Sequence, residues 1–88
     1  MTKSIVLYTK GHCPFCRDAK ALLRAKGVTF TDYEITDNPE LTAEMEARSG
    51  RTTVPQIFIG ETHVGGGADL AALEAAGGLD PLLAPFLS

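Results

Sequence analysis

The chain alternates between short apolar runs of strand length and longer segments in which apolar residues recur with helical spacing. The first apolar run, Ser4 to Tyr8, contains β-branched residues and predicts a buried strand. A helix is predicted from about Pro14 to Lys26, because proline suits a first helical turn and Gly27 is a natural stop. The following apolar positions predict a second strand over about Thr29 to Ile35.

The segment "DNPELTAEMEARSG" predicts a second helix. Asp37 or Asn38 can cap its start, with Glu40 three residues after Asp37 as in a capping box, and Gly50 can end it. "PQIFIG" and "THVGG" predict two strands joined by a hairpin turn. A third helix is predicted in "ADLAALEAAGG", and a short last helix is predicted to start at Asp80.

The predicted order of elements is βαβαββα plus a short C-terminal helix. A βαβ unit pairs its strands in parallel, whereas a hairpin pairs them antiparallel. The order therefore predicts an α/β fold with a mixed four-stranded sheet flanked by helices. The sequence contains no repeats, low-complexity tracts or linkers, so a single domain over residues 1–88 is expected.

The composition limits the classes of partner and the cellular compartment that we expect for the protein. Eight basic and eleven acidic residues give a formal net charge of -3, and no segment gathers Lys and Arg as binding to nucleic acid would require. No segment approaches the roughly 18 apolar residues of a membrane span, and the N-terminal apolar run is short for a signal peptide. A secreted domain of this size commonly carries several disulfides, whereas this chain has two cysteines. We expect a cytoplasmic monomer that binds neither nucleic acid nor membrane.

Cys13 and Cys16 lie where the first predicted strand is followed by the first helix. At a helix N-terminus, unpaired backbone amides and the helix dipole stabilise a thiolate relative to a thiol. Lys10 and Arg17 are close enough in sequence to add positive charge. Cys13 is therefore the predicted nucleophile, and Cys16, one turn into the helix and less exposed, is the predicted resolving thiol.

Two other interpretations of the cysteine pair are a structural staple and half of a metal site. A disulfide that spans so few residues removes little entropy from the unfolded chain, so its value as a staple is small. A tetrahedral metal site needs four ligands, and the chain offers only His12 and His63 beyond the cysteines, without the usual paired spacing. The residues therefore favour a redox pair without a metal, and both histidines are interpreted as ordinary surface or turn residues.

Five landmarks carry a resemblance to the glutaredoxins, in particular to the small bacterial dithiol members: "YTKGHCPFC", "GVTF", "SGRTTVPQIFIG", "HVGGGADL" and "GGLDPLL". The resemblance extends over nearly the whole chain. It implies a thioredoxin-like fold and a glutathione-dependent thiol–disulfide oxidoreductase that reduces protein disulfides and glutathione mixed disulfides. Glutathione would be the reducing co-substrate, regenerated by glutathione reductase and NADPH, with no permanently bound cofactor.

The resemblance also implies a glutathione site. It implies a cis-proline at Val54–Pro55, whose backbone would pair with the cysteinyl part of glutathione, although a proline that opens a strand is unremarkable by itself. It implies that Asp69 pairs with the ammonium group and that Ala68 stands where the family usually has Asp or Ser. The implied residues are Lys10, Phe15, Arg51, Thr53, Val54, Pro55, Gln56, Gly67, Ala68 and Asp69.

Among these residues, Lys10, Gln56 and Arg51 match positions that contact the glycine carboxylate of glutathione in the family, and the amides of Gly67 and Ala68 would accept the γ-glutamyl carboxylate. From the residues alone, the polar side chains could equally be solvent-exposed, and "GGGADL" could be a turn followed by a helix start. Phe15 keeps an aromatic surface beside the cysteines without the hydroxyl of the tyrosine that is common there.

Two alternative functions stay open at this point. One is an iron–sulfur scaffold in which two chains and two glutathiones hold a cluster, as in the monothiol branch of the family. Pro14 and Cys16 replace the Gly and Ser of that branch, which argues against it. The other is a redoxin reduced directly by a flavoprotein reductase, against which the "TVP" and "GGGADL" segments favour glutathione.

Overall fold

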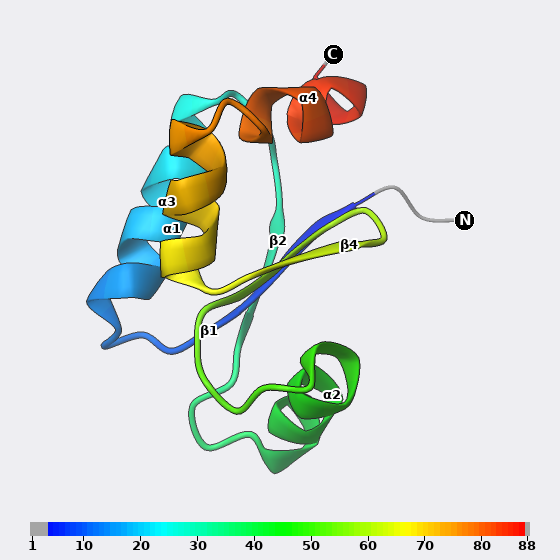
Figure 1. Cartoon of the computed structure of the whole chain (residues 1–88). Coiled ribbons are helices and arrows are strands. Elements are labelled where there is room, and N and C mark those ends of the chain that lie inside the picture. The colour runs from blue at the N-terminus through cyan, green and yellow to red at the C-terminus, as the bar shows by residue number, and fades with distance from the viewer. Residues whose placement is uncertain (1–3, 88) are drawn as a thin grey trace.

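The computed structural model describes residues 4–87, in which four strands form one mixed sheet (Figure 1). The strands are β1 (Ile5–Thr9), β2 (Thr31–Glu34), β3 (Gln56–Ile59) and β4 (Thr62–Gly65). Their spatial order is β2-β1-β3-β4, with β1 parallel to β2, β3 antiparallel to β1, and β4 antiparallel to β3. The predicted thioredoxin-like α/β fold is confirmed.

Helices cover both faces of this sheet. The helices are α1 (Pro14–Ala25), α2 (Pro39–Ser49), α3 (Gly67–Ala75) and α4 (Leu79–Leu83), and a 3₁₀ turn, Ala84–Phe86, follows α4. In Figure 1, α1 and α3 lie side by side, and α2 lies on the opposite side of the sheet. Within the part of the chain that the structure describes, no helix has the length and apolar character needed to cross a membrane.

The larger core lies between the sheet and the helices α1, α3 and α4. Alternate residues of the two central strands point into it, as the period of two along a strand requires. Its buried members are Ile5, Leu7, Ala19, Leu23, Val28, Ile57, Ile59, Leu70, Leu79 and Leu83. This core holds α1 and α3 against the central strands. Both helices begin at the same end of the sheet, where β1 and β4 finish.

The smaller core lies between the other face of the sheet and α2. Tyr8, Ile35, Met45 and Phe58 are its buried members. Arg48 of α2 lies 4.3 Å from the centre of the Phe58 ring and donates a hydrogen bond to the Tyr8 hydroxyl at 2.7 Å. A cation–π contact and a hydrogen bond, both from Arg48, therefore join α2 to the sheet.

The structure corrects two predicted boundaries and decides between the two predicted caps of α2. Strand β2 covers Thr31–Glu34 rather than Thr29 to Ile35, and all its residues are exposed at the edge of the sheet. The start of α2 is capped by Asn38, whose Oδ1 accepts a hydrogen bond from the Leu41 amide at 3.0 Å. The predicted capping box from Asp37 is wrong, because Asp37 lies outside the helix with a φ of 55°. The last helix begins at Leu79, one residue before Asp80.

Candidate active site

The cysteines lie where the chain turns from β1 into α1. The Cys13 amide donates to the Lys10 carbonyl at 3.2 Å, which closes the turn, and the Gly11 amide donates to the Glu34 carboxylate at the end of β2. Cys13 is the residue that caps α1: its sulfur accepts a hydrogen bond from the Cys16 backbone amide at 3.3 Å. A helix N-terminal amide therefore points at this sulfur, an arrangement that stabilises negative charge.

The two thiols have different surroundings. Both thiols are free. Cys13 is partly exposed, whereas Cys16, in the first turn of α1, has no exposed surface. Burial, together with a hydrogen bond to Cys13, raises the pKa of Cys16 from 9.0 to about 12. At neutral pH Cys16 therefore stays a thiol, while the Cys13 sulfur is the one that an external group can reach.

The segment before β3 faces the Cys13 sulfur. The Val54–Pro55 peptide bond is cis, as the resemblance implies. The Cys13 sulfur lies 4.0 Å from the Val54 carbonyl oxygen. Val54 precedes β3, and in residues 4–87 its amide forms no backbone hydrogen bond. The chain thus presents a strand-like edge next to the sulfur, to which an extended peptide could add.

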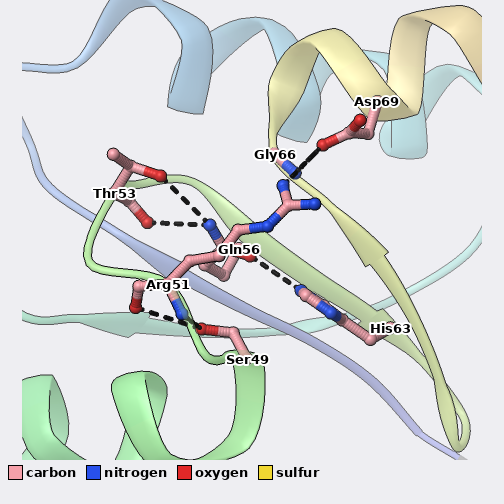
Figure 2. Close-up of polar contacts among 7 residues, drawn as sticks. All are labelled: Ser49, Arg51, Thr53, Gln56, His63, Gly66 and Asp69. Carbon is pink, nitrogen blue, oxygen red and sulfur yellow. Dashed lines mark hydrogen bonds and ion pairs between the residues drawn. The ribbon is translucent and has the colours of Figure 1, made fainter.

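The start of α3 brings the carboxylate of Asp69 to the same end of the sheet as the cysteines. The Asp69 carboxylate accepts a hydrogen bond from the Gly66 amide at 2.9 Å (Figure 2). Its Oδ2 atom also lies 2.8 Å from Nη1 of Arg51, an ion pair between groups that are both about half exposed. The Gly66 amide and then Arg51 lower the pKa of Asp69 below its ordinary value. Two residues predicted to bind glutathione are therefore brought together as partners of each other.

Phe15 and Gly67 form the contact between α1 and α3 beside the cysteines. Phe15 is 65% exposed. A side-chain carbon on Gly67 would lie 3.3 Å from the Phe15 Cβ and 3.6 Å from the Pro55 Cγ, so glycine allows a close approach here. A groove of about 270 Å³ runs from Phe15 along α1 and α3, past Gly67 and Ala68.

Lys10 and Gln56 have different surroundings. Lys10 lines a groove of about 580 Å³ together with His12 and the start of α2. Gln56 has no exposed surface, and its amide donates to the Thr53 carbonyl at 3.0 Å. In this arrangement the Gln56 side chain cannot contact a ligand on the surface, because a buried amide bonds to its own chain instead.

His63 is the residue that the sequence interpretation missed. Its ring stacks on Phe58 with 4.7 Å between ring centres, and its Nε2 atom lies 2.8 Å from Oε1 of Gln56. Burial, followed by the charge of Arg51, lowers the pKa of His63 from its ordinary 6.5. The alternation in "THVGG", which places His63 on the same sheet face as Phe58, could have indicated this. His12 is exposed, and residues 4–87 contain no group of three His, Cys, Asp or Glu side chains able to hold a metal.

Comparison with known proteins agrees with this geometry. A glutaredoxin family model matches residues 5–64. Glutaredoxin 3 of Escherichia coli K12 is 58% identical over 80 residues, covering 91% of this chain and 96% of that protein, and a Pseudomonas aeruginosa glutaredoxin is 57% identical over 79 residues, covering 90% and 94%. The crystal structure of a buckwheat glutaredoxin–glutathione complex has a TM-score of 0.86 at 27% identity, covering 96% of this chain and 81% of that one. The chain therefore belongs to the glutaredoxin family of glutathione-dependent thiol–disulfide oxidoreductases.

Proposed function

We propose that the protein removes glutathione from glutathionylated proteins and reduces protein disulfides, with Cys13 as nucleophile and Cys16 as resolving thiol. One observation carries the proposal: the partly exposed Cys13 sulfur accepts the Cys16 amide hydrogen bond and lies beside the Val54 carbonyl. The exposed sulfur has the stabilised charge and the access that attack on a disulfide requires.

In the glutathione route, the Cys13 thiolate attacks the glutathionyl sulfur of a mixed disulfide. A new disulfide forms between Cys13 and glutathione, and the protein leaves as a thiolate that takes a proton from solvent. The thiolate of a second glutathione then attacks the same sulfur, which releases glutathione disulfide and regenerates the Cys13 thiolate. One disulfide is reduced and one is formed, so the electrons balance without a metal or flavin.

In the dithiol route, Cys13 attacks a disulfide within a substrate protein and forms an intermolecular disulfide. Cys16 then gives up its proton and attacks the Cys13 sulfur, which releases the reduced substrate and leaves a Cys13–Cys16 disulfide. Two glutathiones reduce this disulfide and become glutathione disulfide. The raised pKa of Cys16 keeps it protonated until an attached substrate has converted the Cys13 thiolate to a disulfide.

The residues around Cys13 are suited to glutathione, a peptide with two carboxylates, an ammonium and a thiol. The free backbone edge at Val54 can pair with the cysteinyl residue, as in strand addition. The first amides of α3, at Gly67 and Ala68, can receive the γ-glutamyl carboxylate, and Asp69 can receive the ammonium. Because Arg51 pairs with Asp69 before any ligand arrives, glutathione would exchange this ion pair for its own carboxylate and ammonium.

The experiment is turnover of a small glutathione mixed disulfide by glutathione, with glutathione reductase and NADPH present to report the glutathione disulfide formed. We expect saturable activity that the Cys13→Ser variant lacks. A full rate in that variant, or no rate in the wild-type protein, would remove the proposal. An anaerobic absorption spectrum tests the iron–sulfur alternative, and replacing glutathione by a flavoprotein reductase tests the direct redoxin.

A further inference from the structure

The segment 51–55 carries the Val54 carbonyl that faces Cys13, yet it belongs to neither helix nor strand. Its backbone is therefore not held by the regular hydrogen bonds of a sheet or helix. Next to Val54, the backbone of this segment is hydrogen-bonded by a buried side chain. The Gln56 Nε2 atom donates to the Thr53 carbonyl at 3.0 Å and lies 3.3 Å from the Thr53 hydroxyl (Figure 2). The Thr53 carbonyl, in the same peptide unit as the Val54 amide, is therefore hydrogen-bonded to a buried side chain.

The orientation of the Gln56 amide follows from the same contact. A carbonyl oxygen only accepts, so the amide nitrogen must face Thr53 and the amide oxygen must face His63. His63 Nε2, 2.8 Å from that oxygen, must then carry a proton and donate it. The His63 ring is held in turn by stacking on Phe58 of β3, with an interplanar angle of 23°. A continuous chain of contacts thus runs from the sheet through His63 and Gln56 to the segment beside the nucleophile.

We infer that Gln56 and His63 are positioning residues for this reaction: together they hold the Thr53 carbonyl so that the Val54 backbone edge faces the Cys13 sulfur. Neither residue touches the reacting atoms. Gln56 is completely buried, and the effect is transmitted through the Thr53 carbonyl. The inference deepens the proposed function and rests on it for its kinetic consequence, since the Val54 edge is the proposed peptide-binding edge.

Two variants break the chain of contacts at different points. Gln56→Met keeps a long side chain of similar volume and removes the donor to Thr53. His63→Phe keeps the stack on Phe58 and removes the donor to Gln56. One net hydrogen bond corresponds to a change of about three- to tenfold, so we expect KM for a glutathione mixed disulfide to rise by this factor in Gln56→Met and less in His63→Phe. The double variant should be no worse than Gln56→Met, because both changes interrupt one connection.

A role limited to stability is separated from positioning by a matched control. Tyr8 is completely buried on the same sheet face and is paired with Gln56 in the β1–β3 register. Tyr8→Phe removes the hydrogen bonds of its hydroxyl with Glu44 and Arg48, keeps the ring in the core, and removes no hydrogen bond of segment 51–55. This variant should lower the guanidinium unfolding midpoint with KM unchanged. In Gln56→Met, KM should rise while kcat and the iodoacetamide labelling rate of Cys13 stay within about twofold of wild type.

Backbone ¹⁵N relaxation measures the same connection without using activity. Order parameters of Thr53 and Val54 should be near the rigid value of about 0.85 in the wild-type protein and fall in both Gln56→Met and His63→Phe, but not in Tyr8→Phe. Unchanged order parameters and KM in Gln56→Met would overturn the inference, as would an equal rise of KM in Tyr8→Phe. If Gln56→Met does not fold, His63→Phe decides by the same criteria. If the wild-type protein does not turn over the mixed disulfide, the proposed function fails, and the order parameters still decide the positioning.

Discussion

The backbone amide of Cys16 donates a hydrogen bond to the Cys13 sulfur at 3.3 Å, while the Cys16 side chain itself lies completely buried. Cys16 therefore supplies two different groups to the site. Its amide stabilises charge on the Cys13 sulfur, and its buried thiol is the proposed resolving thiol. The three-residue spacing produces this arrangement, because Cys13 caps the helix and the amide three residues later is one of its unpaired donors.

Chemical labelling should distinguish the two thiols in the folded protein. A thiol with a pKa of about 12 is ionised to roughly one part in 10⁵ at pH 7, and Cys16 is also inaccessible. We expect iodoacetamide to modify Cys13 at least about a hundredfold faster than Cys16, as measured by mass spectrometry of peptides over time. In guanidinium chloride both cysteines should react at similar rates. Similar rates in the native protein would contradict the assignment of Cys13 as nucleophile.

Replacing each cysteine should separate the two routes. Cys16→Ser should keep reduction of a small glutathione mixed disulfide, because that route uses one thiolate and two successive glutathiones. The same variant should lose most of the dithiol reduction of a protein disulfide, whereas Cys13→Ser should lose both activities. Rates on the two substrates, followed by NADPH oxidation with glutathione reductase, provide the measurement. An equal loss from both variants on the small substrate would mean that the dithiol cycle is obligatory.

The position of the cysteines could be predicted from sequence because it depends on local patterns. An apolar run, a proline in a first turn and a closing glycine define the strand, the turn and the helix around Cys13. The mixed four-stranded sheet followed from the order of elements in the same way, and the thioredoxin-like fold was implied by the resemblance. The edge strand β2 was predicted too long, because the apolar residues that flank it, Val28 and Ile35, are buried in the two cores without belonging to the sheet.

The contacts around segment 51–55 could not be predicted from sequence. Gln56 is a polar residue in an apolar strand, and sequence alone does not show that Thr53 and His63 satisfy its amide in the interior. The Arg51–Asp69 ion pair likewise joins residues 18 positions apart that the resemblance assigns to a ligand. Such contacts depend on how the hairpin and α3 pack, which is a property of the tertiary structure.

Two glycine variants should differ although both positions need a left-handed backbone. Gly65 has a φ of 118° and Gly77 a φ of 80°, so alanine at either position costs about 1 kcal/mol in backbone conformation. At Gly65 the added Cβ would also overlap the Asp69 carboxylate, whereas at Gly77 nothing lies within 4 Å. We expect Gly65→Ala to lose at least about 1 kcal/mol more unfolding free energy than Gly77→Ala, measured in guanidinium, and to raise KM for glutathione. Equal losses with equal KM would argue against the contact with Asp69.

Ala68→Asp should strengthen glutathione binding modestly. Ala68 is exposed in the first turn of α3, where an acidic side chain could receive the ammonium group together with Asp69. An exposed charged contact contributes at most about 1 kcal/mol, so a fall of KM by about fivefold is the upper limit. Ala71→Asp, on the next turn and exposed to solvent, is the matched control for added charge. No change, or the same change in both variants, would show that the site does not use this position.

The pKa of the Asp69 carboxyl should depend on Arg51. The Gly66 amide and then Arg51 hold the pKa of Asp69 below its ordinary 3.8, so the unfolded state takes up this proton first as the pH falls. The contribution of Asp69 to stability is therefore fully present above pH 3.8 and is lost as the pH falls through the lower, folded-state pKa. Arg51→Gln should move the Asp69 carboxyl ¹³C titration midpoint upward, while the remaining Gly66 hydrogen bond keeps it below 3.8. A wild-type midpoint at or above 3.8, or one that Arg51→Gln leaves unchanged, would contradict the contact between these residues in solution.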